Sequence, residues 1–144
     1  QWWDLAGRPA GNAPERARRL IGQALTDAWD GARGGFAYTL DFDGKVAIPA
    51  RYWWPVTEAI GAVAMLLKLD PRPEDEAWYR RLWQFADAKL IDHKRGGWFP
   101  ELDANDRPAM TQFNGKPDIY HSIQAVLFPL TPGISRHMAG LGAA

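Results

Sequence analysis

Apolar residues recur at helical spacing in the first part of the chain. Pro14 stands at a favourable first helical position, and Asn12 precedes it as a candidate cap. Apolar side chains then follow every three or four residues as far as Gly31, at Ala17, Leu20, Ile21, Ala24, Leu25 and Ala28. This spacing predicts an amphipathic helix over residues 14–31.

A second helix is expected over residues 51–69, and its pattern is different. After Glu58 nearly every position is apolar, and Pro71 follows the run and ends it. A helix that is apolar almost all round is buried on all sides. Between the two helices, Asp43-Gly44 separates two short strand-like segments, residues 34–40 and 45–48, which predicts a β-hairpin.

The chain repeats this plan with an offset of 62 positions. Arg18-Arg19-Leu20 aligns with Arg80-Arg81-Leu82, and Gly34-Gly35-Phe36 aligns with Gly96-Gly97-Trp98. The offset grows by about four residues after the second hairpin, where Trp54 aligns with Tyr120 and Glu58 with Gln124. The second unit therefore predicts a helix over residues 74–93, a looser hairpin over residues 96–110 and an apolar helix over residues 118–130.

Outer amphipathic helices that alternate with inner buried helices are typical of an α/α toroid. We therefore expect an all-α fold of the (α/α)6 barrel family, with β-hairpins between the helices. Six such helix pairs need roughly 370 residues, so this chain is expected to hold about two and a third units. Residues 1–7 are expected to end a preceding inner helix. Residues 1–130 then form the C-terminal part of a single barrel domain, and residues 131–144 form a tail.

Composition excludes several classes of protein. Seventeen basic and 17 acidic side chains give a formal net charge of zero, whereas a nucleic-acid surface needs an excess of Lys and Arg. No apolar run approaches the roughly 18 residues of a membrane span. The absence of Cys excludes disulfides and Cys-ligated zinc, and a cytoplasmic location is expected. The eight Trp are either core residues or flat surfaces of the kind that bind sugars.

Two polar residues interrupt the apolar inner helices at matching levels. His121 lies in the first turn of residues 118–130, and Glu58 lies near the start of residues 51–69. The first turns of the inner helices wall the cavity of a toroid, and a buried carboxylate is costly unless it is paired or faces a polar cavity. Both residues are therefore candidate catalytic groups. The alternatives are a hydrogen-bonded core histidine and a structural carboxylate that bridges two helices.

Polar and aromatic residues around this pair are candidates for binding a polyhydroxylated ligand. Aromatic rings offer flat faces to the C–H side of a sugar, and polar side chains hydrogen-bond its hydroxyls. The candidates are Arg51, Trp54, Trp98, Glu101 and Gln124. Within this set, Arg51 is expected one helical face above Glu58, with Trp54 between them.

No metal site is expected in this sequence. The segment Asp41-Phe42-Asp43-Gly44 is too short for a calcium loop, and we interpret it as a turn. The other two histidines are expected to lie outside the cavity, His93 at the end of an outer helix and His137 in the tail.

Three blocks of the sequence resemble the N-acylglucosamine 2-epimerase superfamily. They are Arg51-Tyr-Trp-Trp-Pro-Val-Thr-Glu58-Ala, Gly96-Gly-Trp-Phe-Pro-Glu-Leu-Asp103 and Gly115-Lys-Pro-Asp-Ile-Tyr-His121-Ser-Ile-Gln124-Ala. Their order and spacing are similar to those of the C-terminal third of that fold. The resemblance implies an (α/α)6 barrel that epimerises or isomerises sugars. The third block is similar to that of the aldose–ketose isomerase branch, which implies a mannose–fructose type of reaction.

The resemblance also implies a mechanism without a cofactor. One histidine removes the proton next to the carbonyl of the opened sugar, an enediol forms, and the proton returns on the neighbouring carbon. His121 matches one of two such histidines in the family, and Glu58 matches a carboxylate that holds or tunes a histidine. The second histidine is expected on an inner helix before Gln1. This chain is therefore expected to be a fragment that lacks it.

Other functions stay open at this point. A sugar 2-epimerase and a non-catalytic carbohydrate-binding module both fit the resemblance or the aromatic surface. A glycoside hydrolase would need two carboxylates that flank a glycosidic bond, for which Glu58 and Glu101 are the obvious pair. The expected partner in each case is a sugar, and exposed inner-helix faces favour self-association.

Overall fold

The computed structural model describes residues 1–137 as helices joined by short strands and loops. In chain order the elements are α1 (Trp2–Leu5), α2 (Ala13–Ala28), β1 (Thr39–Leu40), β2 (Val46–Ile48), β3 (Arg51–Tyr52), α3 (Trp53–Leu69), α4 (Pro73–Phe85), a π-helical turn (Ala86–Leu90), β4 (Glu101–Leu102), β5 (Pro108–Ala109) and α5 (Ile119–Leu130). None of the helices formed by these residues is both long and apolar enough to cross a bilayer.

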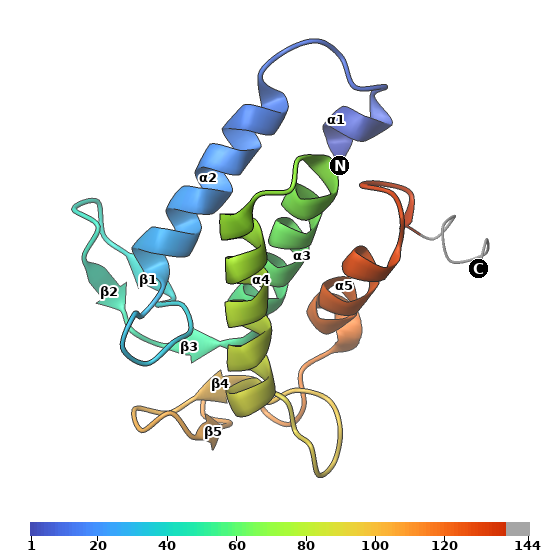
Figure 1. Ribbon diagram of the computed structural model, residues 1–144. Coiled ribbons are helices and arrows are strands. Elements are labelled where there is room, and N and C mark those ends of the chain that lie inside the picture. The colour runs from blue at the N-terminus through green and yellow to red at the C-terminus, as the bar shows by residue number, and fades with distance from the viewer. Residues whose placement is uncertain (138–144) are drawn as a thin grey trace.

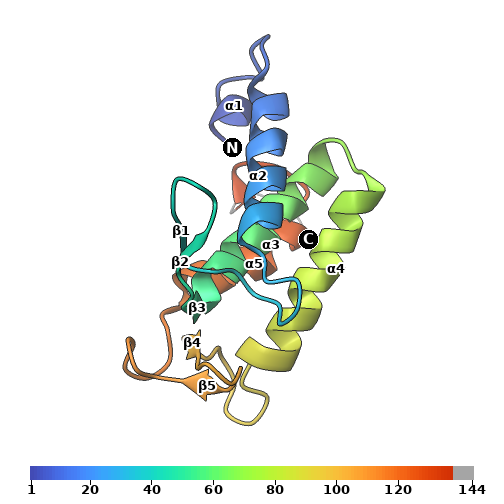
Figure 2. The ribbon, with the colours of Figure 1, turned by 90° about the vertical axis from the view of Figure 1, so that its left-hand side faces the viewer.

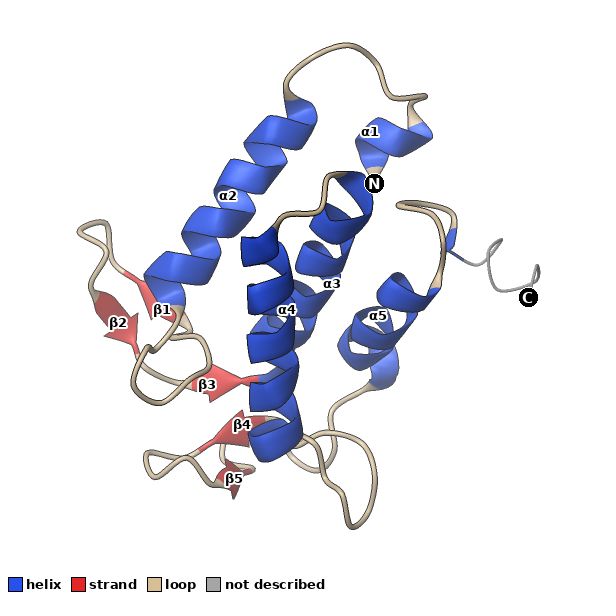
Figure 3. Cartoon of the chain, viewed as in Figure 1, coloured by secondary structure: helices blue, strands red, loops and turns tan. Residues whose placement is uncertain are grey.

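The four long helices alternate in direction, as the repeat predicts. α2 and α4 run toward the strands, whereas α3 and α5 start beside the strands and run away from them (Figure 1). α3 packs against both α4 and α5. Figure 2, turned by 90°, and Figure 3, coloured by element type, place the strands together beside the start of α3. The N-terminal turns of the two inner helices therefore lie at the same end of the molecule.

Helix α3 supplies most of the core. Its side chains Val56, Ile60 and Val63 are fully or almost fully buried, and Leu82 of α4 and Leu90 pack into the same cluster. The polar Thr57 is also buried, and its hydroxyl is satisfied because it donates to the carbonyl of Trp54, 2.9 Å away. No residue of α3 is fully exposed, but Trp54, Glu58 and Ala59 are only half-buried and line a groove, so the prediction of a helix buried on all sides is wrong for this face.

The second hairpin forms one strand pairing that the sequence does not predict. β4 pairs with β5, as expected, but it also pairs with β3 in an antiparallel register that joins Arg51 to Leu102 and Tyr52 to Glu101. The predicted helix over residues 51–69 is therefore wrong at its start, because the first two residues belong to a strand. The helix predicted over residues 74–93 likewise ends earlier, in the π-helical turn whose last bond runs from the N–H of Ile91 to the carbonyl of Ala86.

The internal repeat extends to individual hydrogen bonds in the loop after each outer helix. Asp30 and its equivalent Asp92 each accept, through Oδ1, the N–H groups of the residues two and three positions further on. The isolated β-bridge Trp29–Phe36 recurs in the second unit as Ile91–Trp98. The same sequence pattern has thus produced the same local structure twice, which confirms the repeat.

The two outer helices differ in how they are covered. Leu82 of α4 is 0% exposed, whereas its equivalent on α2, Leu20, is 61% exposed. Ala86 is buried, and its equivalent Ala24 is exposed. α4 packs on the inner helix that precedes it, and within residues 1–137 the only helix before α2 is the four-residue α1. The described part of the chain thus behaves as a segment of a larger ring.

Residues 131–137 follow α5, in the region where a tail is expected. Thr131 and Ile134 are buried, and the ammonium of Lys68 on α3 donates to the carbonyls of Phe128, Thr131 and Gly133. This segment therefore lies against the helices. The other residues of the expected tail, 138–144, lie outside the described residues, and the domain boundary at residue 130 stays a prediction.

Replacing Lys68 with methionine should destabilise the chain by about 1–3 kcal/mol, because three carbonyls at the end of α5 lose a charged donor while the apolar stem is kept. Urea unfolding followed by Trp fluorescence measures the change, with exposed Lys45→Met as the control. An unchanged midpoint for Lys68→Met would show that the ammonium does not hold this segment.

Asp92 links the second hairpin to the loop before α5. Its carboxylate pairs with Lys116 and accepts the N–H groups of Lys94 and Arg95. The Lys116 ammonium, followed by the two backbone amides, lowers the pKa of Asp92 from 3.8 to about 2, against the opposing effect of burial. Because the folded-state pKa is the lower one, the ionised form stabilises the fold above about pH 4, and that contribution is lost as the pH falls toward about 2.

Asp92→Asn should therefore lower the urea midpoint at neutral pH, and its difference from the original chain should shrink between about pH 4 and about pH 2. Exposed Asp43→Asn provides the comparison at each pH. A difference that is constant across this range would contradict the assignment of the stabilisation to the charge on Asp92.

Candidate active site

His121 and Glu58 meet across the contact between the two inner helices. The Nδ1 atom of His121 lies 2.7 Å from Oε1 of Glu58. His121 is in the first turn of α5, which starts where Asp118 caps the helix by accepting the N–H of Tyr120 at 2.9 Å. The side chains of His121 and Glu58 are 27% and 43% exposed. The pair is thus fixed by the protein and open to a ligand.

Gln124 completes this group. Its Nε2 atom donates to the same Glu58 oxygen at 3.1 Å. Residues three positions apart lie on the same face of a helix, so His121 and Gln124 both extend from α5 toward α3. Glu58 therefore does bridge two helices, as one alternative from the sequence proposed, but the residue that it holds is a histidine with an exposed edge.

The contact with Glu58 decides which nitrogen of His121 can react. An ionised carboxylate only accepts hydrogen bonds, so Nδ1 carries the hydrogen in the neutral imidazole. Nε2 is then left with a lone pair, and residues 1–137 form no hydrogen bond to it. This nitrogen is the atom that can take a proton from a ligand.

Aromatic rings surround the imidazole. The ring of Trp54 lies 5.9 Å from that of His121 at a tilt of 35°, and the rings of Trp53 and Tyr120 approach edge-on at 6.0 and 4.8 Å. Trp53 is buried, whereas Tyr120 is exposed. Tyr120 was not among the candidates, although the repeat aligns it with Trp54, and that alignment is the signal that could have found it.

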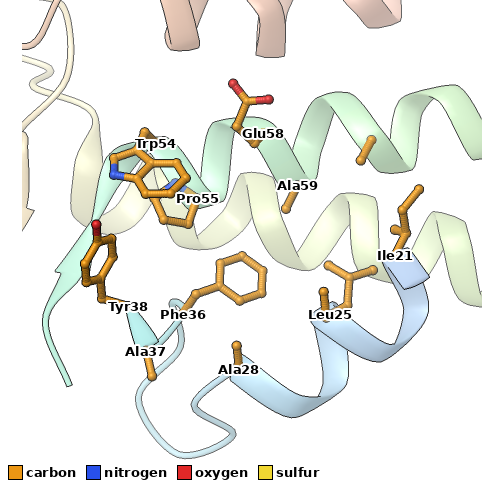
Figure 4. Close-up of a pocket in the computed structure, with 12 residues that line it drawn as sticks. Ile21, Leu25, Ala28, Phe36, Ala37, Tyr38, Trp54, Pro55, Glu58 and Ala59 are labelled. Carbon is orange, nitrogen blue, oxygen red and sulfur yellow. The ribbon is translucent and has the colours of Figure 1, made fainter. Parts of the chain in front are cut away.

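A groove between α2 and α3 adjoins the pair. It has a volume of about 410 Å³, and Trp54 and Glu58 form part of its wall. Figure 4 shows the side chains of Phe36 and Leu25 between the two helices, while the carboxylate of Glu58 points away from them. Tyr38 closes one end, with its ring 6.0 Å from that of Trp54. The sequence did not indicate this aromatic end of the groove.

Arg51 and Glu101 lie within the three-stranded sheet, and their polar atoms are engaged by the chain itself. Arg51 donates to the carbonyl of Gly34 at 3.0 Å and pairs with Asp106, and burial lowers its pKa. Oε1 of Glu101 accepts the hydroxyl of Thr111 at 2.8 Å, together with two backbone N–H groups. The expectation that Arg51 lies one helical face above Glu58 is wrong, because Arg51 precedes the helix.

Trp98, another residue expected to bind the sugar, is buried in the core. Its ring lies 6.3 Å from that of Trp83. Of the five predicted binding residues, the structure thus brings Trp54 and Gln124 to His121 and Glu58. It does not bring Arg51, Trp98 or Glu101 into hydrogen-bond or ring contact with that pair.

The other two histidines lie elsewhere. His93 is exposed after α4 and contacts Asp87, with Nε2 2.9 Å from the Asp87 carbonyl. His137 stacks on Phe128 and lies 2.7 Å from the hydroxyl of Thr131, and burial, assisted by Lys68, lowers its pKa. Among residues 1–137 no three His, Asp or Glu side chains are grouped as a metal would require.

The fold and this pair define a segment of an α/α barrel with a carboxylate-held histidine at the start of an inner helix. The sequence of residues 1–125 matches the N-acylglucosamine 2-epimerase (GlcNAc 2-epimerase) family. The chain therefore belongs to this family, as the resemblance implied, and its fold is part of an (α/α)6 barrel.

Among its relatives are three proteins named D-mannose isomerase. That of Pseudomonas cannabina pv. alisalensis is 38% identical over 129 residues, which are 87% of this chain and 31% of the relative. That of Thermobifida fusca is 36% identical and covers 88% of this chain and 32% of the relative. That of Marinomonas mediterranea is 34% identical and covers 76% and 28%. The chain thus spans about a third of the length of these relatives.

Two solved structures support the same fold. A crystal structure of D-mannose isomerase superposes with a TM-score of 0.77 at 30% identity, over 85% of this chain and 32% of the other. A cellobiose 2-epimerase from Bacillus thermoamylovorans superposes with a TM-score of 0.62 at 19% identity, over 86% of this chain and 32% of the other. The second comparison bears on the fold alone.

Proposed function

We propose that this chain is the C-terminal part of a sugar isomerase that interconverts an aldose and a ketose of the mannose–fructose type. The observation that carries the proposal is the 2.7 Å contact between Nδ1 of His121 and Glu58, which leaves Nε2 free beside a surface open to a ligand. The names of the relatives favour mannose as the aldose.

In the proposed mechanism, Nε2 of His121 takes the proton from the carbon next to the aldehyde of the opened sugar. The electron pair of that C–H bond forms the double bond between C1 and C2, and the aldehyde oxygen takes up a proton, which gives an enediol. The proton on His121 then returns to the former aldehyde carbon while the C2 hydroxyl loses its proton, which gives the ketose. Glu58 stabilises the imidazolium while the proton is on His121. No step requires a cofactor, and the second proton-transfer group is proposed to come from a part of the barrel outside this chain.

Substrate contact within the chain is proposed for Trp54, whose ring lies beside the imidazole. Arg51, Trp98 and Glu101 are proposed to act indirectly, because they hold the hairpins at the end of the molecule where the inner helices start. A cytoplasmic location stays a prediction.

A chimera tests the proposed reaction. This chain replaces the matching third of the Pseudomonas D-mannose isomerase, and the product is incubated with mannose, glucose and a panel of disaccharides under NMR observation. We expect mannose and fructose to interconvert. Conversion of mannose to glucose without fructose would favour a 2-epimerase, cleavage of a disaccharide would favour a hydrolase, and binding without conversion would favour a carbohydrate-binding module. The Pseudomonas protein without its own matching third provides the control.

We further propose that the chain on its own self-associates through the exposed face of the inner helix α5. This face exposes large apolar side chains in a row, at Ile119, Tyr120, Ile123, Val126 and Leu130. Sedimentation should show mass that increases with concentration, and Val126→Glu should reduce the increase whereas Gln84→Glu on the exposed face of α4 should not. A monomer at every concentration would contradict this proposal.

A further inference from the structure

Gln124 shares the Glu58 oxygen that holds the catalytic histidine. Oε1 of Glu58 lies 2.7 Å from Nδ1 of His121 and 3.1 Å from Nε2 of Gln124. An amide can offer an ionised carboxylate only its NH₂ group, so the orientation of the Gln124 amide is set by this contact. Both donors come from α5, and the acceptor comes from α3.

The carboxylate of Glu58 needs a hydrogen-bond donor that holds it in one orientation. Its side chain is 43% exposed, and a half-exposed glutamate has several rotamers that it loses when it is held in one position. Within residues 1–137, the only hydrogen bonds to its carboxylate are those of His121 and Gln124. Gln124 is therefore the only described group, other than the histidine itself, that fixes the direction of the carboxylate.

The packing of α5 on α3 keeps Gln124 within reach. Ala125, next to Gln124, is fully buried. One turn further along, a side chain at Gly61 of α3 would meet the ring of Phe128 at 3.0 Å, so that the two helices approach closely there. Because small residues allow this approach, a side chain of the length of Gln spans the gap to Glu58.

An amide fits the position of Gln124 better than a second carboxylate would. Glu58 and Gln124 occupy equivalent positions in successive units, and the structure brings these two positions together. Two carboxylates at this distance would repel each other, whereas an amide of the same size donates.

We infer that Gln124 is a positioning residue, which orients Glu58 so that His121 keeps its hydrogen on Nδ1 and its lone pair on Nε2. The inference rests on the proposed function, because it is this tautomer that could accept a proton from a sugar carbon. It assigns Gln124 a role through Glu58 in place of the sugar contact that was expected from its polar side chain beside the pair.

The direct test is the tautomer of His121 in this chain, without any sugar. ¹⁵N shifts of the labelled imidazoles are recorded near pH 9, where histidine side chains are neutral, and His121→Asn assigns the signals. We expect the Nδ1–H form to dominate. Gln124→Met, which keeps the length but cannot donate, should lower the ratio of the Nδ1–H to the Nε2–H form by about threefold or more. Gln84→Met, the same change on the exposed face of α4, should leave the ratio unchanged.

Gln124→Glu provides a second variant if Gln124→Met fails to fold, since it keeps the length, loses the donor and places a second carboxylate beside Glu58, which should turn the Glu58 carboxylate away. An unchanged tautomer ratio in a folded variant of either kind would overturn the inference. So would a dominant Nε2–H form in the unaltered chain.

Kinetics in the chimera separate positioning from substrate binding. Gln124→Met should lower kcat at nearly constant KM, because a residue that does not touch the sugar leaves its binding intact. A raised KM with an unchanged kcat would overturn the inference in favour of sugar contact. If the tautomer responds as expected while the unaltered chimera converts no sugar, the proposed function fails and the positioning role stands.

Discussion

Replacing His121 with asparagine in the chimera should lower kcat for mannose by about a thousandfold. A positioned acid–base group typically contributes about 10²–10⁴ to a rate, and Asn cannot take a proton from carbon. The side chain is partly exposed, so that the change should have little effect on folding. The measurement is the rate of fructose formation at saturating mannose.

The matched control for this variant is His93→Asn, because His93 is exposed after α4 and its only hydrogen-bond and ion-pair partner among the described residues is Asp87. It should keep the activity of the unaltered chimera. An active His121→Asn chimera would contradict the assignment of the proton transfer to His121, provided that the Pseudomonas part alone has no activity.

Replacing Glu58 with glutamine should lower kcat by about a hundredfold or more. The neutral amide cannot stabilise the imidazolium, and it can turn its NH₂ group toward Nδ1, which would favour the tautomer with the hydrogen on Nε2. The effect is expected to be smaller than that of His121→Asn, because the histidine itself remains.

For Glu58→Gln the matched control is Glu74→Gln, an exposed residue in the first turn of α4. The two variants remove the same charge from the chain, so that a general effect of net charge would appear in both. If Glu58→Gln kept full activity, the carboxylate would be a helix bridge without a part in the reaction.

The fold could be predicted largely because the sequence contains the same structural unit twice. One hydrophobic pattern with one set of turn residues fixes the order of outer helix, hairpin and inner helix, and the second copy confirms the first. His121 and Glu58 could be found for a related reason, since polar residues stand out in helices that are otherwise apolar. The sequence placed them at matching levels of two inner helices, and the structure adds that their side chains are in hydrogen-bond contact.

What could not be predicted depends on contacts between distant segments. The pairing of β3 with β4 joins residues about fifty positions apart in the chain, and no local pattern specifies it. Because of this pairing, Arg51 leaves the predicted helix and its guanidinium is taken up by Gly34 and Asp106. Glu101 is occupied by its own hairpin in the same way. A polar residue in a candidate block can thus stabilise the fold instead of binding a ligand, and sequence alone does not distinguish these two roles.

The exposure of apolar side chains on the outer helices depends on which inner helices of the barrel are present. Leu20 is exposed where its equivalent Leu82 is buried, although the two residues are identical and occupy equivalent helical positions. The difference lies in the preceding inner helix: α4 packs on α3, which precedes it, whereas the only described helix before α2 is the four-residue α1.

The most direct test of the central claim is the exchange of the substrate proton with solvent. The chimera is incubated with mannose in D₂O, and NMR follows the entry of deuterium at C2 of mannose and C1 of fructose. If Nε2 of His121 carries the proton, deuterium enters with the unaltered chimera and fails to enter above background with His121→Asn. Deuterium entry at the same rate in both proteins would contradict the claim.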